Sequence, residues 1–230
     1  VTNLGNTFSN ISNLTDISVL ASWNTSNVVS MEGLFSNDRS LANISALASW
    51  DTSSLANMSR MFYENSSLSD LSPLATWNTS SLTNMYYTFC GIAMTNVNAL
   101  RTKQYDGKDY VSWDVSHVTN MSLTFYRDHS LTDISALASW NTSNVKDMGG
   151  MFDYSYKITD ISALASWDTS SVTDMSEMFY DIHYLKDISP LATWNTSNVK
   201  DISYMFRYTS VTSVDALETK QHEGKGYIND

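Results

Sequence analysis

Apolar residues recur along this chain in two short runs that alternate with polar segments and return every 27 residues. One run reads Val-x-x-Met-x-x-Met-Phe in segment 172–179, and the other reads Leu-x-x-Ile-x-x-Leu in segment 131–137. Neither run is long enough for a stable isolated helix, and neither keeps the two-residue alternation of a half-buried strand. The pattern therefore predicts a tightly wound coil in which strands of a few residues alternate with one-turn helices and β-turns.

The aromatic residues keep the same register. Tryptophans follow one another at intervals of 27, 27, 36, 27, 27 and 27 residues, and a phenylalanine lies twelve residues after each tryptophan. A fixed period of this length is typical of repeat solenoids, in which each unit packs only on its neighbours. Because burial of such aromatic columns holds a solenoid together, we assign them to the core rather than to a carbohydrate-stacking surface. The two columns are Trp23, Trp50, Trp77, Trp113, Trp140, Trp167 and Trp194, and Phe35, Phe62, Phe89, Phe125, Phe152, Phe179 and Phe206.

A longer repeat lies over the short one. Segment 94–113 returns at 211–230 as a similar sequence, shifted by 117 residues, so a block of four units with an extended last unit is duplicated. We therefore expect residues 1–230 to form a single solenoid of about seven to eight turns, cut from a longer array. The two blocks are 1–112, with an insertion at 101–112, and 113–230, with an insertion at 218–229.

Charge and composition exclude several functions. The formal net charge is −11, which argues against nucleic-acid binding, where a basic surface is expected, and against adsorption to anionic lipid. No apolar run is long enough to span a membrane, so we expect no membrane insertion. Cys90 is the single cysteine, and only two of the four histidines, His129 and His183, share a repeat phase. These residues give no nucleophilic triad, so we expect neither an enzyme nor a cofactor.

Two longer motifs carry a family resemblance. Segments 131–152 (LTDISALASWNTSNVKDMGGMF) and 187–206 (DISPLATWNTSNVKDISYMF) resemble the repeat of BspA-like leucine-rich-repeat surface proteins. More narrowly, they are similar to the W-[ND]-T-S-x-V-x-x-M-x-x-M-F subclass of lactic-acid bacteria and mycoplasmas. The resemblance covers nearly the whole chain, and the extended fourth unit departs from it. It implies a right-handed leucine-rich-repeat solenoid with short parallel strands, exported to a bacterial cell surface or cell wall, with adhesion as its role.

Aspartates recur at two repeat positions. In parallel coils, stacked carboxylates lie about 5 Å apart, and such stacks are able to bind Ca²⁺. However, Asn replaces Asp at Asn43 and Asn57, and the property that the two residue types share is turn capping. We therefore favour a turn-stabilising ladder and expect no metal site. The two columns contain Asp70, Asp133, Asp160 and Asp187, and Asp147, Asp174 and Asp201.

The segment after each phenylalanine varies from unit to unit. It is rich in Tyr, Arg and His, and Tyr and Arg contribute much of the contact energy in protein interfaces. These positions form either an exposed binding ridge or a solvated loop, and the sequence leaves both open. Segment 102–111 contains Asp106-Gly107, a hairpin signal. That hairpin contacts a ligand, covers an edge of the solenoid or sets the spacing along a longer array. The candidate binding residues are Tyr63, Tyr126, Arg127, His129, Tyr154, Tyr156, Tyr180, His183, Tyr184, Arg207 and Tyr208 in the ridge, and Lys103, Tyr105, Lys108 and Tyr110 in the hairpin.

These features together predict a cell-surface adhesin. We expect it to bind host mucin, glycosaminoglycan or another sulfated glycan, or an extracellular-matrix protein, as a monomeric segment of a longer array. Binding should strengthen at acidic pH, because protonated carboxylates no longer repel anionic polymers. The alternative function is a passive, rigid stalk that presents another domain from the cell wall.

Overall fold

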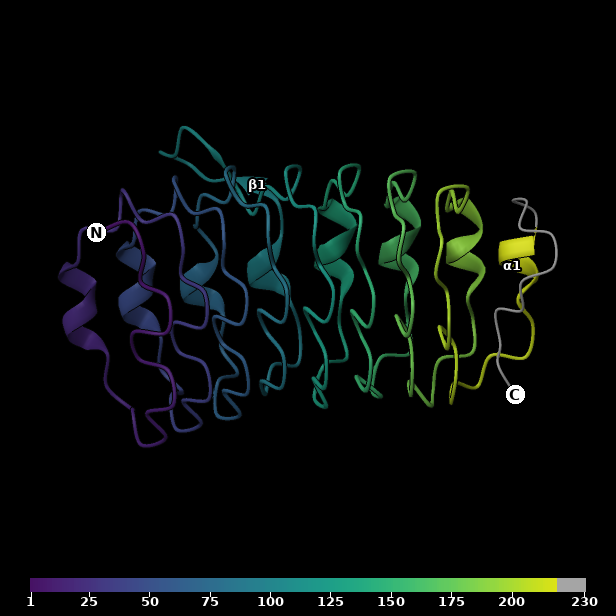
Figure 1. The fold of residues 1–230 in the computed structure, drawn as a ribbon, viewed down its shortest axis with the longest axis horizontal. Helices are drawn as coiled ribbons and strands as arrows, with labels where there is room; N and C mark the ends of the chain where they lie inside the picture. Colours follow the sequence, from purple (N-terminus) through teal and green to yellow (C-terminus); the bar gives the residue numbers. More distant parts are fainter. Residues whose placement is uncertain (219–230) are drawn as a thin grey trace.

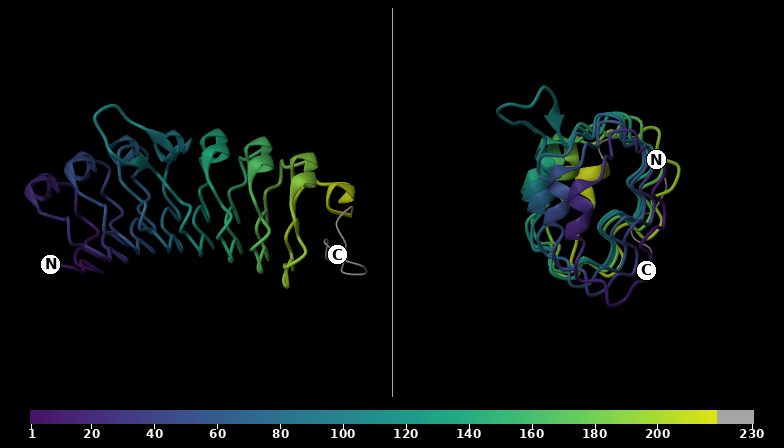
Figure 2. Two further views of the ribbon diagram at one scale, coloured as in Figure 1. Left: turned by 90° about the horizontal axis from the view of Figure 1, so that it is seen from above. Right: turned by 90° about the vertical axis from the view of Figure 1, so that its left-hand side faces the viewer.

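The chain winds into one elongated solenoid in a computed structural model that describes residues 1–218 (Figure 1). Each repeat unit makes one turn of the coil, and the units stack in sequence order along the long axis. Viewed along this axis, short helices line one side of the coil and irregular turns line the other (Figure 2). The solenoid predicted from the sequence is therefore confirmed.

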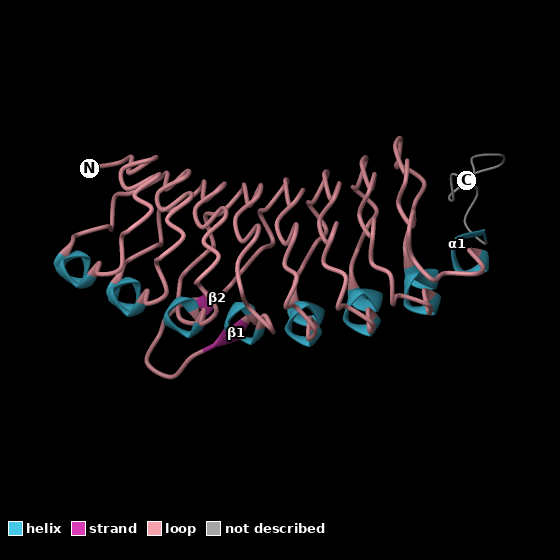
Figure 3. Ribbon diagram, turned by 90° about the horizontal axis from the view of Figure 1, so that it is seen from below, coloured by secondary structure: helices cyan, strands magenta, loops and turns pink. Residues whose placement is uncertain are grey.

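A short 3-10 helix follows an apolar column residue in every unit, and successive helices form a row along one side (Figure 3). An Asp or Asn two residues before each helix accepts the N–H of the first helical residue. Asp133 Oδ1, for example, accepts the backbone N–H of Ser135 at 2.9 Å. The apolar run is one turn long, which suits the 3-10 form. The helices are η1 (Ser18–Ser22), η2 (Ser45–Ser49), η3 (Ser72–Leu74), η4 (Asn98–Leu100), η5 (Ser135–Ser139), η6 (Ser162–Ser166) and η7 (Ser189–Thr193), followed by the α-helix α1 (Asp215–Glu218).

The side of the coil opposite the helices is a ribbon of turns rather than a flat sheet. Parallel pairing between units occurs at isolated bridges, such as Asp147 with Asp174, so the predicted short strands are reduced to single residues. The cause is a positive φ at the tenth and fourteenth residues after each tryptophan, for example 55° at Leu123 and 60° at Arg127. These residues turn the chain, yet their N–H groups still donate to carbonyls of the next unit at 2.9 Å.

The core contains the two aromatic columns. Successive phenylalanine rings stack with centroids 5.6–6.0 Å apart. Each buried indole N–H donates to a leucine carbonyl of the preceding unit, as from Trp140 to Leu100 at 2.8 Å. Trp23 departs from the predicted core, since the residue is 37% exposed and, among the described residues, its ring contacts Phe8 at 5.8 Å but no other tryptophan. The remaining column tryptophans are buried, so the columns both fill the core and join consecutive units.

The first insertion forms the hairpin that its Asp-Gly pair predicts. Strand β1 (Lys103–Gln104) pairs antiparallel with β2 (Val111–Ser112), and Gly107 takes the positive φ of 74° in the connecting loop. The hairpin leaves the coil beside η4 and bends back toward the N-terminal units (Figures 1 and 2). The second predicted insertion, 218–229, lies outside the described residues from residue 219 on.

Candidate binding surface

Six tyrosines from six successive units form a continuous line of rings along the solenoid. Neighbouring ring centroids lie 5.3–5.9 Å apart, and most pairs meet edge to face, a favourable aromatic geometry. We call this line the tyrosine ridge. Its members are Tyr63, Tyr87, Tyr126, Tyr154, Tyr180 and Tyr208. The variable segments predicted from the sequence are thus brought together into one surface.

The backbone of the ridge is held in an unusual conformation. Tyr154 and Tyr208 have φ values of 58° and 60°, in the left-handed region that Asn tolerates better than an aromatic residue does. Asn10 and Asn37 occupy the same repeat position, with φ values of 64° and 63°. A non-glycine residue in this region costs on the order of 1 kcal/mol, and such residues cluster at functional sites. The Tyr154 N–H donates to the Tyr180 carbonyl of the next unit at 3.0 Å, which holds this strained residue in place.

Arginines lie against the tyrosines at three points of the ridge. The guanidinium carbon of Arg60 lies 5.8 Å from the ring centroid of Tyr87, and that of Arg207 lies 4.9 Å from the ring of Tyr208. Arg127 is 5.8 Å from the neighbouring Tyr126 ring. Arg207 Nη2 also donates to the Tyr208 hydroxyl at 3.1 Å, and Arg127 Nη1 lies 3.8 Å from the Glu64 carboxylate, so ring contacts and polar contacts together fix these guanidinium groups. The ridge therefore presents fixed positive charges at intervals along a line.

The first of these arginines closes a hollow in the surface. This hollow has a volume of about 350 Å³ and lies at the N-terminal part of the ridge. Its lining residues are Ser36, Asn37, Arg60, Tyr63, Tyr86 and Tyr87. The sequence predicts Tyr63 as a binding residue, but it does not predict the other three side chains with a ring or guanidinium group in the hollow, Arg60, Tyr86 and Tyr87. They precede the phenylalanine, whereas the prediction considered the segment that follows it.

A second, shorter aromatic line contains the two histidines that share a repeat phase. The ring of His129 stacks on Tyr156 at 4.8 Å, and Tyr156 faces His183 at 6.5 Å. Each imidazole Nδ1 lies 3.1 Å from a carbonyl oxygen of the ridge backbone, that of Tyr154 or Tyr208. The carbonyl accepts a hydrogen bond from the Nδ1–H, so both histidines have a fixed orientation beside the ridge.

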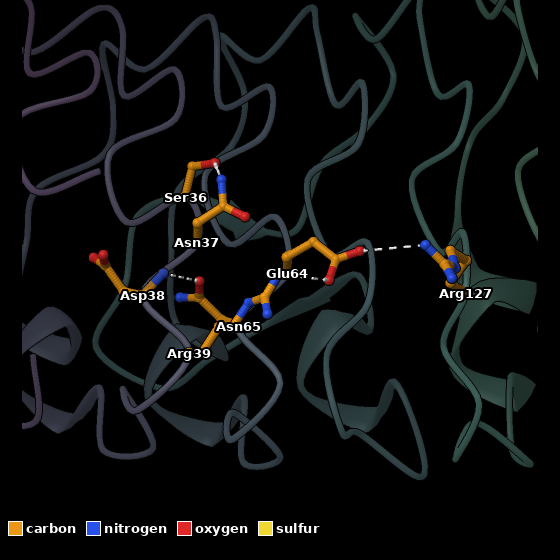
Figure 4. Close-up of polar contacts among 7 residues, drawn as sticks. All are labelled: Ser36, Asn37, Asp38, Arg39, Glu64, Asn65 and Arg127. Atoms are coloured by element: carbon orange, nitrogen blue, oxygen red, sulfur yellow. Dashed lines mark hydrogen bonds and ion pairs between the residues drawn. The ribbon is translucent and has the colours of Figure 1, made fainter. Parts of the chain in front are cut away.

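Glu64 bridges two arginines of different units (Figure 4). Its carboxylate lies 4.0 Å from the guanidinium of Arg39 and 3.8 Å from that of Arg127. The side chain passes over Gly91, where a Cβ atom would meet the Glu64 carboxyl group at 3.3 Å. This glycine therefore leaves room for an ion pair that skips one unit. The two arginines are half or more exposed, so the pair orders the surface more than it stabilises the fold.

Polar side chains are buried directly beneath the ridge. Asp38 and Asp128 are fully buried, and each uses Oδ1 to accept a backbone N–H of the preceding unit while Oδ2 has no partner in the described structure. Asn65 occupies the same repeat position and accepts the N–H of Asp38 at 3.1 Å (Figure 4). Burial raises the pKa of Asp38 to about 6 and that of Asp128 well above its usual range. Burial, with Glu177 and Asp181 nearby, raises the pKa of Asp153 to about 8.

The remaining predicted binding residues lie apart from the ridge. Tyr184 is 62% exposed and makes no ring contact within the described residues. In the hairpin, Lys103 lies 4.0 Å from the ring of Tyr105, and Lys108 lies 5.6 Å from that of Tyr110. Cys90 is buried beneath the ridge, and desolvation raises the pKa of its thiol far above the usual range, which makes it a poor nucleophile.

The two acidic columns act as turn caps. Asp174 Oδ1 accepts the N–H of Ser176 at 2.8 Å, and Asn120 Oδ1 does the same for Ser122 at 2.9 Å. Asp and Asn are interchangeable here because the carbonyl-like oxygen alone is used. Among residues 1–218, no group of three or more His, Cys, Asp or Glu is placed to hold a metal ion. The same residues include no helix that is long and apolar enough to cross a membrane.

These features define a repeat solenoid with an ordered aromatic and cationic surface line. The chain belongs to the family described as "Mycoplasma protein of unknown function, DUF285", whose model matches residues 2–101 and 92–219. This match confirms the resemblance to BspA-like repeat proteins. The sequence comparison with curated proteins gives no match.

Among solved structures, the chain is similar to two internalins of Listeria monocytogenes. The internalin inlF is 14% identical over 89% of this chain and 62% of its own, with a TM-score of 0.35. Internalin C2 (inlC2) is 18% identical over 83% of this chain and 76% of its own, with a TM-score of 0.38. The chain therefore spans less than two thirds of the length of the inlF structure.

Proposed function

We propose that this protein is part of a bacterial cell-surface adhesin and that the tyrosine ridge binds a linear anionic glycan, such as a sulfated or sialylated chain of host mucin. The observation that carries the proposal is the continuous line of six tyrosine rings with arginines set against it. Rings spaced less than 6 Å apart offer a linear polymer one contact per unit. The arginines supply hydrogen-bond donors that match sulfate and carboxylate oxygens.

Local charge supports an anionic partner in spite of the net charge of −11. Arg60, Arg127 and Arg207 lie on the ridge, whereas the carboxyl of Asp153 beneath it is buried with a raised pKa of about 8 and is mostly neutral at pH 7. The acidic groups nearby are Glu64, which pairs with Arg127, the exposed Glu177, and the partly buried Asp181, which lies 3.3 Å from His183. Acidification from pH 7 protonates the buried carboxyl of Asp38, whose pKa burial raises to about 6, and so removes negative charge beneath the ridge. Binding to an anionic glycan should therefore strengthen as the pH falls from about 7 to about 5.

The test is binding of the purified chain to immobilised mucin and to heparin at pH 5 and pH 7, at low and high salt. Arg127→Gln and Tyr154→Asn remove a ridge charge and a ridge ring, and Asn is already present at the position of Tyr154 in other units. Arg101→Gln removes an exposed arginine at the end of η4 and serves as the control. We expect each ridge variant to weaken binding by about tenfold and the control to leave it unchanged.

The opposite result would favour the stalk. The glycan proposal would be refuted if the protein bound neither mucin nor heparin. It would also be refuted if binding were unchanged by salt and by the two ridge substitutions. The solenoid would then act as a spacer, for which the continuous core and inter-unit hydrogen bonds are sufficient. Binding to a matrix protein that depends on the same substitutions would keep the ridge as the contact surface and replace the glycan by a protein partner.

A further inference from the structure

The hairpin of the first extended unit encloses a groove against the solenoid. Its loop bends back toward the N-terminal units, as the ribbon shows (Figures 2 and 3), and it faces the turns that contain Trp50 and Asn78. The groove has a volume of about 580 Å³, within the range of small-molecule sites. It is lined by segments 48–53 and 107–110 together with Thr76 and Asn78. None of these residues lines the hollow of the tyrosine ridge.

One wall of the groove is a fixed aromatic ring with a free cation beside it. The hydroxyl of Tyr110 donates to the backbone carbonyl of Thr76, which anchors the hairpin to the solenoid and sets the position of the ring. The Lys108 ammonium lies 5.6 Å from the centroid of that ring. Within residues 1–218 the ammonium has no ion pair. Its three donors are therefore available to a ligand.

The opposite wall supplies acceptors and an amide. Asp51 uses only Oδ1 for its turn, where it accepts the backbone N–H and the hydroxyl of Ser53 at 3.0 and 2.7 Å. Asn78 likewise uses only its Oδ1, which accepts the N–H of Ser80 at 3.1 Å. The second Asp51 oxygen and the Asn78 amide nitrogen make no hydrogen bond within the described chain. The groove therefore offers donors and acceptors on facing walls.

We propose that this groove is a second binding site, which takes a short neutral oligosaccharide. Sugar hydroxyls both donate and accept, so they match Lys108, Asn78 and Asp51 together, while the apolar face of a pyranose suits the Tyr110 ring. An anionic ligand would meet the carboxylates of Asp51 and Asp109, and a cationic ligand would meet the ammonium of Lys108. The site does not depend on the tyrosine ridge, so it stands whether or not the ridge binds a glycan.

The same residue types recur in the second block. Asp168, Asn195, Lys225 and Tyr227 stand 117 residues after Asp51, Asn78, Lys108 and Tyr110. Other turns of the chain carry the aspartate or asparagine without a lysine and tyrosine insertion. The set is therefore a property of each four-unit block rather than of every repeat. For this reason the test below is run in an Asp168→Asn background, which removes the matching aspartate of the second block.

The experiment titrates the Asp168→Asn protein with lactose, maltotriose and N,N′-diacetylchitobiose, followed by isothermal calorimetry and ligand-observed NMR. Asp51→Asn and Lys108→Ala, each added singly, should weaken binding of the sugar that binds by about tenfold. Asn replaces Asp at this turn position in other units, as at Asn24 and Asn141, so Asp51→Asn preserves the fold. Asp187→Asn, at a similar turn far along the coil, is the matched control and should change nothing.

Three results would overturn the proposal. The first is no binding of any of these sugars up to about 10 mM, a limit that corresponds to an affinity too weak for a built site. The second is binding that Asp51→Asn and Lys108→Ala leave unchanged. The third is loss of binding in the ridge variant Arg127→Gln but not in the groove variants, which would place the sugar on the ridge. Circular dichroism of every variant, with unchanged melting curves, separates loss of binding from loss of fold.

Discussion

Replacing Asp38 by asparagine should raise the stability of the protein at neutral and alkaline pH and leave it unchanged in acid. The folded state raises the pKa of this buried carboxyl from 3.8 to about 6, because burial disfavours its charged form. The folded protein therefore holds the proton more tightly than the unfolded chain does. The resulting stabilisation is complete below pH 3.8 and is lost as the pH rises through about 6.

The structure sets the size of this effect. A pKa raised by about 2 units corresponds to about 3 kcal/mol between the two limits. Asp38 lies near the N-terminal end, and Ile11, whose N–H it accepts at 2.7 Å, is 43% exposed, so solvent screens part of the effect. We therefore expect about 1–2 kcal/mol. Asparagine keeps the Oδ1 acceptor and does not titrate, so the Asp38→Asn protein should melt about 2–8 °C above the native protein at pH 8.

The assay is differential scanning calorimetry of both proteins at pH 4, 5, 6, 7 and 8. The matched control is Asn65→Asp, since Asn65 is buried at the same repeat position one unit later. That substitution introduces a buried carboxyl, so it should lower the melting temperature at pH 8 and have little effect at pH 4. If the melting temperatures of the native and Asp38→Asn proteins differed by the same amount at every pH, or by more at pH 4 than at pH 8, that result would refute the burial argument.

Two further predictions concern the core and the turns. Trp140→Ala should cost about 3–5 kcal/mol, because the ring is 3% exposed and its N–H is bonded to the preceding unit, whereas Tyr184→Ala, at a 62% exposed ring, should cost less than about 1 kcal/mol. If Tyr184→Ala lowered the melting temperature more than Trp140→Ala did, our assignment of buried and exposed residues would be wrong. Asp174→Asn should leave the melting temperature unchanged while Asp174→Ala lowers it by an amount equivalent to about 1 kcal/mol, since only the Oδ1 acceptor is used. EDTA should have no effect, and a loss of stability that Ca²⁺ restores would show that the aspartate columns bind metal.

The sequence predicts the fold well because its main determinant is a period. Trp140 and Phe152 stand at fixed offsets in a repeated unit, and an offset that recurs in every unit is what a shared core position requires. The Asp106-Gly107 pair is a local signal, so the hairpin is also predictable. The ribbon of turns is not, since its left-handed positions carry residues as different as Leu123 and Arg127, and no single residue type marks them.

The sequence predicts only some residues of the candidate surface, because the others are brought to it by contacts between neighbouring units. Tyr87 lies two residues before the phenylalanine, yet its ring completes the line between Tyr63 and Tyr126. Asp38 and Asp128 fall in the variable segment that the sequence assigns to the outside, but the fold buries them. Their role is to accept an N–H from the preceding unit, 27 or 36 residues away. Such a contact depends on how neighbouring coils are stacked, and the offset within one unit does not reveal it.

The bond from each indole N–H to the preceding helix has a mechanical consequence. These bonds point along the axis of the solenoid, as from Trp167 to Leu137 and from Trp194 to Leu164, both at 2.9 Å. A force that pulls the two ends apart therefore loads all the interfaces in series, and the weakest interface alone sets the force at which the protein opens. A force across the axis instead shears one unit against its neighbours and is shared by the stacked rings and the backbone bonds. The solenoid should thus resist a load that crosses the coil better than a load that runs along it.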